Sequence, residues 1–144
     1  MTVRFLDTNI LLRYFTRDDE KKAAQTLSLL TRVESGAEKV VTSPLVLFEV
    51  VFTLERSYAV PKARVAELVF PILGLRGLKL PNKTLWRMAL RLYVEHSLDF
   101  ADAYNASYMH ALGISEIYSW DTDFDTIPGI TRRLEPAHDT QEAA

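Results

Sequence analysis

The sequence lacks cysteine altogether, which excludes a disulfide framework, a thiolate metal site and a zinc finger. It also lacks the basic excess of a typical nucleic-acid-binding domain, because 17 Lys and Arg face 19 Asp and Glu, a net charge of −2. The hydrophobic share of 48% and the charged share of 25% are those of an ordinary globular protein. We therefore expect a single folded domain over residues 1–134 and a flexible polar tail at 135–144.

Signals for membranes and secretion are missing as well. No uncharged stretch reaches the roughly 18 residues that are needed to cross a bilayer. The N-terminus enters a short apolar strand and then an aspartate, without the apolar run of a signal peptide. We expect a cytoplasmic protein.

Several familiar catalytic and binding motifs are absent. The chain has no G-x-S-x-G, no G-x-G-x-x-G and no G-x-x-x-x-G-K-[ST], so it has neither a nucleophile elbow nor a phosphate-binding glycine loop. An EF-hand loop that began at Asp121 would need glycine and glutamate where Thr126 and Arg132 stand, which excludes this calcium motif. The three histidines fit structural or surface roles.

The hydrophobic pattern alternates short strands with helices. We expect strands near residues 3–6, 39–42, 78–80, 116–120 and 130–134, with helices between them. Residues suited to cap the starts of these helices are Asp18 or Asp19, Ser43, Asn82 and Asp99. This order predicts an α/β fold, a three-layer α/β/α sandwich around a mainly parallel sheet, whose sites form outside the carboxyl ends of the strands.

Four acidic residues lie where such a site would form: Asp7, Glu49, Asp102 and Asp121. Carboxylates that converge from distant segments would repel one another, so a divalent cation at their meeting point is the simplest explanation. Oxygen ligands without histidine favour Mg²⁺ or Mn²⁺, and a pair of such ions about 3.5–4 Å apart can promote phosphodiester hydrolysis. We predict a metal-dependent phosphodiesterase that acts on nucleic acid.

These acids also have simpler interpretations. Asp7 could merely cap the helix that follows it, and Glu49 could face solvent on the open side of its helix. Asp99 fits a helix cap better than a ligand, whereas Asp102 lies inside the helix and is the better candidate. In the run of aspartates at 121–125, at least one residue is expected to make only turn hydrogen bonds.

Four segments resemble PIN-domain ribonucleases, in particular the VapC-type toxins of toxin–antitoxin pairs. They are residues 5–12 (FLDTNILL), 43–50 (SPLVLFEV), 98–103 (LDFADA) and 119–124 (SWDTDF), within a resemblance that runs from about residue 3 to 134. One departure is the polar stretch at 105–107, where the family is usually aliphatic. The resemblance implies that Asp7, Glu49 and Asp102 are the core metal ligands, that Asp121 is the fourth acid, that Thr8 orients Asp7 or a water, and that Asp99 and Asp123 are accessory acids.

The same resemblance implies hydrolysis of RNA with Mg²⁺ or Mn²⁺ and 5′-phosphate products. Because the net charge is slightly negative, RNA must be held by local basic patches. Lys83, Arg87 and Arg91 lie at i, i+4 and i+8 of one helix, either as such a patch or as an ordinary solvated face. Arg13 and Arg17, near the Asp7 turn, are alternative phosphate contacts.

Partners follow from the resemblance too. VapC-like proteins form homodimers and bind a small VapB-like antitoxin whose tail covers the active site. The expected helices at 44–58 and 61–73 carry enough Phe, Val and Leu to form a groove for it, although burial in the core would also explain them. We expect a homodimer.

Two other functions remain open at this point. A PIN-like domain could serve as a binding module without catalysis, but the intact set of acids argues against this. A Mg²⁺-dependent receiver-like or phosphatase-like domain would need an Asp-x-Asp arrangement at the first strand, and Asn9 stands at the second position.

Overall fold

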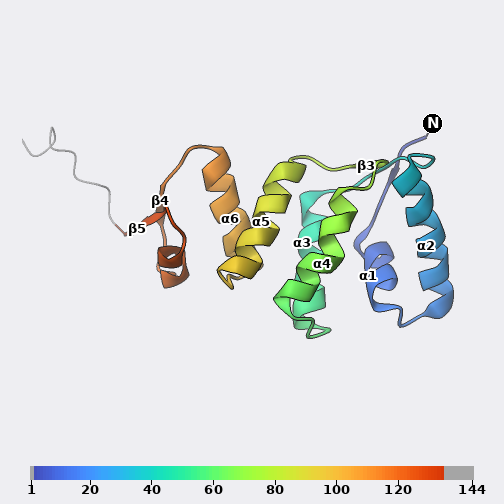
Figure 1. The fold of residues 1–144 in the computed structure, drawn as a ribbon, viewed down its shortest axis with the longest axis horizontal. Helices are drawn as coiled ribbons and strands as arrows, with labels where there is room; N and C mark the ends of the chain where they lie inside the picture. The colour runs from blue at the N-terminus through green and yellow to red at the C-terminus, as the bar shows by residue number, and fades with distance from the viewer. Residues whose placement is uncertain (1, 135–144) are drawn as a thin grey trace, which may run out of the picture.

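The computed structural model describes residues 2–134, so the tail predicted at 135–144 lies outside the described residues. Strands and helices alternate along the chain, which confirms the α/β class (Figure 1). The elements are β1 (Arg4–Phe5), α1 (Thr8–Thr16), α2 (Glu20–Ser35), β2 (Val40–Val41), α3 (Pro44–Arg56), α4 (Lys62–Leu73), β3 (Leu78–Lys79), α5 (Lys83–Glu95), α6 (Phe100–Ala111), β4 (Glu116–Tyr118), the 3₁₀ helix η1 (Thr122–Thr126) and β5 (Thr131–Arg133).

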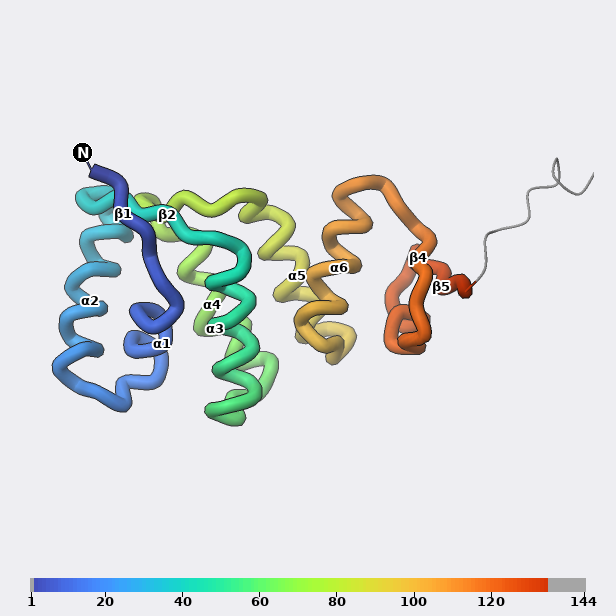
Figure 2. The backbone as a smooth tube through the Cα atoms, turned by 180° about the vertical axis from the view of Figure 1, so that it is seen from behind, coloured from blue at the N-terminus to red at the C-terminus, as the bar shows by residue number. Residues whose placement is uncertain are grey.

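All strand pairs are parallel, as the sequence predicted, and they form two short sheets. The first has the order β1-β2-β3, with Arg4 opposite Val40 and Val40 opposite Leu78. The second pairs β4 with β5. In Figure 2 the first sheet lies near the N-terminal end of the molecule and the second lies near the opposite end, with α5 and α6 between them. One edge of β1 and one edge of β4 therefore have no strand partner among the described residues.

Two of the predicted helix caps are present and two are not. The side chains of Asp19 and Ser43 accept hydrogen bonds from backbone amides three residues further on, which closes the first turns of α2 and α3. Asn82 and Asp99 directly precede α5 and α6, but neither side chain makes a capping bond. Asn82 has left-handed backbone geometry (φ 58°), and the Asp99 carboxylate faces Arg56 instead, so their predicted capping roles are wrong.

Aromatic side chains join α3, α5 and α6. The Phe100 ring stacks on Trp86 with 5.3 Å between ring centroids and meets Tyr93 edge-on at 5.4 Å. Phe48 on α3 contacts the same ring at 6.0 Å. Because Trp86 and Tyr93 are fully buried, Phe100 fixes the start of α6 in the core, two residues before Asp102.

Gly77 lies where the chain leaves α4 and enters β3, and its position leaves no room for a side chain. A Cβ atom there would lie 2.1 Å from the carbonyl oxygen of Glu38 and 2.8 Å from that of Val33. The Gly77 amide donates to the same Val33 carbonyl at 2.8 Å, and the amide of Val40 donates to the Gly77 carbonyl at 2.9 Å. Glycine thus lets α2, β2 and β3 meet at close range.

Over residues 2–134, no helix is both long enough and apolar enough to cross a bilayer.

Candidate metal centre

Three carboxylates converge between α6 and the segment that follows β4. Asp102 lies in the first turn of α6, Asp121 directly precedes η1, and Asp123 lies within η1. Each offers an oxygen, and these oxygens all lie within 4.8 Å of one another. Over residues 2–134 this is the one group of three or more His, Asp or Glu side chains with such spacing, and we call it the acidic cluster.

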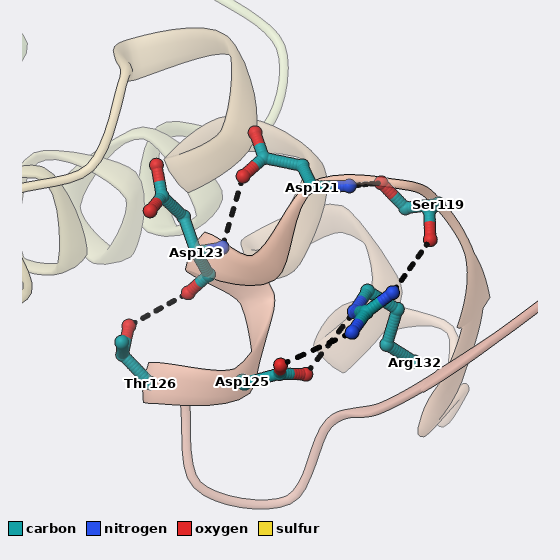
Figure 3. Close-up of polar contacts among 6 residues, drawn as sticks. All are labelled: Ser119, Asp121, Asp123, Asp125, Thr126 and Arg132. Carbon is teal, nitrogen blue, oxygen red and sulfur yellow. Dashed lines mark hydrogen bonds and ion pairs between the residues drawn. The ribbon is translucent and has the colours of Figure 1, made fainter.

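Local hydrogen bonds orient the two aspartates of the η1 segment (Figure 3). The Asp121 carboxylate accepts from the backbone amide of Asp123 at 2.9 Å and so closes the first turn of η1. The amide of Asp121 donates to the Ser119 hydroxyl at 3.0 Å, and the Thr126 hydroxyl donates to the carbonyl of Asp123 at 2.7 Å. The turn leaves both carboxylates free to offer oxygens to a ligand.

Asp125, the third aspartate of the run, has a structural contact instead. Its carboxylate accepts from Nε and Nη2 of Arg132, at 3.3 and 3.4 Å (Figure 3). The same guanidinium donates through Nη1 to the Ser119 carbonyl at 3.4 Å. Asp125 therefore ties η1 to β5 through a side-chain ion pair, whereas the sequence predicted only turn hydrogen bonds for at least one acid of this run.

The acidic cluster strongly perturbs Asp102. Desolvation of its half-buried carboxyl, followed by hydrogen bonding to Asp121 and the negative charges of Asp121, Asp99 and Asp123, raises the pKa of Asp102 to about 6. A cation between the carboxylates would relieve this repulsion. Three carboxylates without a cysteine or histidine match the ligand preference of Mg²⁺ and Mn²⁺, so the residues present fit the predicted metal.

Thr8 and Glu49 form a second polar contact, which links the turn after β1 to α3. The buried Thr8 donates from Oγ1 to Oε2 of Glu49 at 2.8 Å. The PIN resemblance implied that Thr8 orients Asp7 or a water, and in the structure its hydroxyl contacts Glu49. Asp7 precedes α1 without a capping bond from its side chain, so nothing in the described structure supports a mere capping role for it.

The structure brings two of the four predicted ligands together and leaves two apart. Asp102 and Asp121 meet in the acidic cluster, where Asp123, predicted as an accessory acid, joins them. Asp7 and Glu49 are not members of the cluster. Asp7 follows β1 in one sheet, whereas Asp121 follows β4 in the other, and Glu49 lies on α3. The full set of four remains a prediction.

Asp99, the other predicted accessory acid, points to a different neighbour. Its Oδ1 lies 3.5 Å from Nη2 of Arg56, in an ion pair whose side chains are both more than half exposed. Its charge is one of the smaller causes of the raised Asp102 pKa.

The predicted basic stripe on α5 is only partly free. Lys83 donates to the carbonyl of Leu78 at 2.7 Å, and Arg87 donates to the carbonyl of Leu73 at 3.5 Å. Desolvation, followed by the charge of Arg87, lowers the pKa of Lys83. Arg91 is exposed. Two residues of the stripe thus bind the backbone of the α4–β3 region, which the sequence pattern could not reveal.

Arg13, one of the two alternative phosphate contacts, is also engaged. Its Nη1 donates to Oδ1 of Asp18 at 2.7 Å, and this bond together with the Asp18 charge raises the pKa of Arg13. The other alternative, Arg17, ends α1 in left-handed geometry and is exposed.

Comparison with known proteins agrees with the motif pattern. The family model of the PIN domain matches residues 4–130, and no curated protein matches the chain significantly. Among solved structures, VapC20 of Mycobacterium tuberculosis, a toxin that cleaves the sarcin–ricin loop, is 21% identical, with 86% of this chain and 93% of that chain covered and a TM-score of 0.38. The resemblance predicted from four sequence segments is confirmed by the family match, and the chain belongs to the PIN-domain family.

Proposed function

We propose that this protein is a divalent-metal-dependent endoribonuclease, the toxin of a VapBC-type toxin–antitoxin pair. The observation that carries the proposal is the acidic cluster within a PIN domain: Asp102, Asp121 and Asp123 direct carboxylate oxygens to within 4.8 Å of one another. Such a cluster suits Mg²⁺ or Mn²⁺, and RNA, as a polyanion, would approach it only with its charge neutralised.

Each acid has a defined task in this proposal. Asp102, Asp121 and Asp123 would hold the metal, with Asp121 and Asp123 oriented by the η1 turn. When bound, the ion would supply positive charge next to the scissile phosphate and an activated water. Asp7 and Glu49 would complete the ligand set, and Thr8 would hold the Glu49 carboxylate in one orientation.

Completion of the site requires the acidic cluster to approach Asp7 and Glu49. The free edges of β1 and β4 support such a change, because unpaired strand edges readily accept a partner strand. Both strands expose large apolar side chains, Phe5 at 58% and Tyr118 at 65% of their surface, which pairing would help to cover. We propose that the two edges come together within one chain when the metal binds.

Substrate and protein partners are proposed from the family and from the surface. Arg17 and Arg91 are exposed, and over the described residues neither is in an ion pair, so they are available to phosphate groups. Exposed apolar side chains on α3 and α6, namely Leu45, Phe52 and Tyr108, offer surface for a second subunit or a VapB-like antitoxin. RNA as the substrate would place the activity in the cytoplasm.

The alternatives raised by the sequence are less well supported. The family match favours a PIN domain over a receiver-like or phosphatase-like domain. A PIN-fold binding module would have no need for three converging carboxylates.

The test is cleavage of total tRNA and ribosomal RNA by purified, antitoxin-free protein. Cleavage with Mg²⁺ or Mn²⁺ that is lost in EDTA, in Asp7→Asn and in Asp102→Asn would support the proposal. A charge-reversing substitution of Arg132 is unsuitable as a control. Arg132 lies outside the acidic cluster, but it contacts Asp125, and loss of this contact would loosen η1. Glu20→Gln, an exposed substitution at the start of α2, is a suitable control and should cleave normally. Folded protein that binds Mn²⁺ and cuts neither RNA would contradict the nuclease proposal for these substrates and favour the binding module.

A further inference from the structure

A second group of polar side chains lies at the corner between α3 and α4, outside the acidic cluster. Glu55 is in the last turn of α3, Lys62 begins α4, and Tyr93 comes from α5. The Tyr93 hydroxyl donates to Oε2 of Glu55 at 2.8 Å, and Nζ of Lys62 lies 3.2 Å from Oε1 of the same carboxylate. The Lys62 ammonium also sits over the Tyr93 ring, 4.5 Å from its centroid.

This corner is largely shielded from water. The side chains of Lys62 and Glu55 are 27% and 21% exposed, and Tyr93 is completely buried. Desolvation, followed by the hydrogen bond to Glu55 and its charge, raises the pKa of Tyr93, so its hydroxyl stays a donor. Charges in such surroundings are costly unless they are paired in good geometry, so the three groups hold one another in a single arrangement.

Lys62 extends this arrangement to the segment that precedes α6. Its Nζ donates to the carbonyl of Leu98 at 2.5 Å. Leu98 is buried and stands four residues before Asp102. One residue further, Asp99 pairs with Arg56 at the end of α3. Two polar contacts therefore connect the α3–α4 corner to the start of α6.

The two helices joined in this way carry two of the predicted metal ligands. Glu49 lies on α3, less than two turns before Glu55, and Asp102 lies in the first turn of α6. Between them, Phe48 contacts Phe100 through their rings, an apolar contact. The Lys62 contacts add polar bonds of defined direction and length to this aromatic packing.

We propose that Lys62 is a positioning residue: by binding both Glu55 and the Leu98 carbonyl, it sets the position of α6 relative to α3. It thereby sets the position of Asp102 relative to Glu49, and so the affinity of the proposed metal site for a divalent ion. Lys62 acts through other residues, since its contacts are Glu55, Tyr93 and Leu98 and none of them belongs to the acidic cluster. The effect on metal affinity rests on the proposed metal-dependent function. The effect on helix position does not.

The first experiment measures helix position without metal. Because the chain has no cysteine, spin labels at Leu45→Cys on α3 and Asn105→Cys on α6, both at exposed positions, would be the sole labels. Electron paramagnetic resonance should give a narrow distance distribution in the otherwise wild-type chain and a broader or shifted one with Lys62→Met. Arg64→Met is the matched control on the same helix, because Arg64 pairs with Glu67 on the exposed surface, and it should leave the distribution unchanged.

The second experiment measures Mn²⁺ affinity by calorimetry in the same full-length proteins. Lys62→Met should weaken binding about tenfold, the low end for residues that orient metal ligands indirectly, whereas Lys62→Arg should largely restore it. If Lys62→Met does not fold, Glu55→Gln, which keeps an acceptor for Tyr93 but loses the charge, should give a smaller shift in the same direction. If Lys62→Met or Glu55→Gln lowers the melting temperature but changes neither the distance distribution nor the Mn²⁺ affinity, the proposal is overturned. Absence of Mn²⁺ binding in the wild type would instead overturn the proposed function and leave the distance measurement to decide the position of α6.

Discussion

Thr8 and Glu49 are 41 residues apart in the sequence, yet the hydroxyl of one donates to the carboxylate of the other at 2.8 Å. The threonine is buried at the start of α1, directly after Asp7, and the glutamate projects from α3. The hydrogen bond therefore couples two of the segments that carry the PIN resemblance. It also restricts the orientation of a predicted metal ligand before any metal is bound.

Removal of this hydroxyl should weaken the site without disturbing the core. Thr8→Val keeps the shape of the side chain but leaves Glu49 free to rotate, and a hydrogen bond to a charged group contributes about 1.5–3 kcal/mol. We expect Mn²⁺ affinity, measured by calorimetry, to fall about tenfold, which corresponds to about 1.4 kcal/mol, just below that range. Thr8→Ser keeps the hydroxyl and should bind Mn²⁺ nearly as the wild type does. Equal affinity in Thr8→Val and the wild type would show that this bond does not serve the metal site.

Local sequence signals predicted the features that depend on local contacts. Ser43 followed by proline marks the start of α3, and Asp19 marks that of α2, because a cap and the amide that it binds are three residues apart. The position of an acid just after a predicted strand also pointed to the right part of the fold, since Asp121 does follow β4 and joins the acidic cluster, although β4 is largely exposed.

The features that the sequence did not predict depend on contacts between distant segments. Asp99 is a residue type that often caps helices, but its carboxylate forms an ion pair with Arg56, 43 positions earlier in the chain. The spacing of Lys83 and Arg87 fits a basic stripe, yet each finds a backbone carbonyl of the α4–β3 region. The division into two sheets is equally invisible, because the hydrophobic pattern predicts strands but does not say which edges pair.

The raised pKa of Asp102 predicts a characteristic pH dependence. Desolvation and the neighbouring Asp121 raise this pKa from 3.8 to about 6, so the folded protein binds a proton that the unfolded chain releases. Without metal, the contribution of this group to stability is therefore full below pH 3.8 and is lost as the pH rises to about 6. The proton competes with the metal, so Mn²⁺ affinity should increase as the pH rises through the same window.

The comparison with Asp102→Asn isolates this group from the other carboxylates. In EDTA, the melting temperature of the asparagine variant minus that of the wild type should be larger at pH 7 than at pH 4.5. If the difference is the same at both values, Asp102 titrates in the folded protein as it does in the unfolded chain, and its environment is not the one described.

The crowded position of Gly77 predicts a large effect of the smallest side chain. A Cβ would be 2.1 Å from the Glu38 carbonyl, so Gly77→Ala must push backbone segments of α2, β2 and β3 apart. Overpacking of this kind costs about 1–3 kcal/mol or more. Gly74→Ala is the matched control, because its Cβ would lie 3.5 Å from the Pro71 carbonyl, an ordinary contact. Thermal unfolding should show a clear loss for Gly77→Ala and little change for Gly74→Ala, and similar melting temperatures for both variants would contradict the close approach.

Complementation between inactive variants can decide how the two groups of acids meet. Asp7 follows β1, whereas Asp102 lies on α6 next to the acids that follow β4. The strands β1 and β4 belong to separate sheets near opposite ends of the molecule (Figure 2). Pairing of the free β1 and β4 edges could occur within one chain or by exchange between the chains of a homodimer. Pairing within one chain is favoured because both edges are on the same polypeptide, where the effective concentration of a flexibly connected partner is typically in the millimolar range.

We therefore expect that Asp7→Asn and Asp102→Asn, unfolded together and refolded as a mixture, stay as inactive as either variant alone, because each chain would then contain a damaged site. The double variant Asp7→Asn/Asp102→Asn, refolded in equal amount with the wild type, serves as the reference. If the β1 and β4 edges pair within each chain, the double variant leaves the activity of the wild-type chains intact. If they are exchanged between chains, every site of a mixed dimer contains at least one damaged ligand. Activity that reappears in the mixture of single variants would mean that one chain supplies Asp7 and the other supplies Asp102. The catalytic unit would then be a strand-exchanged dimer, and the free edges of β1 and β4 would be its interface.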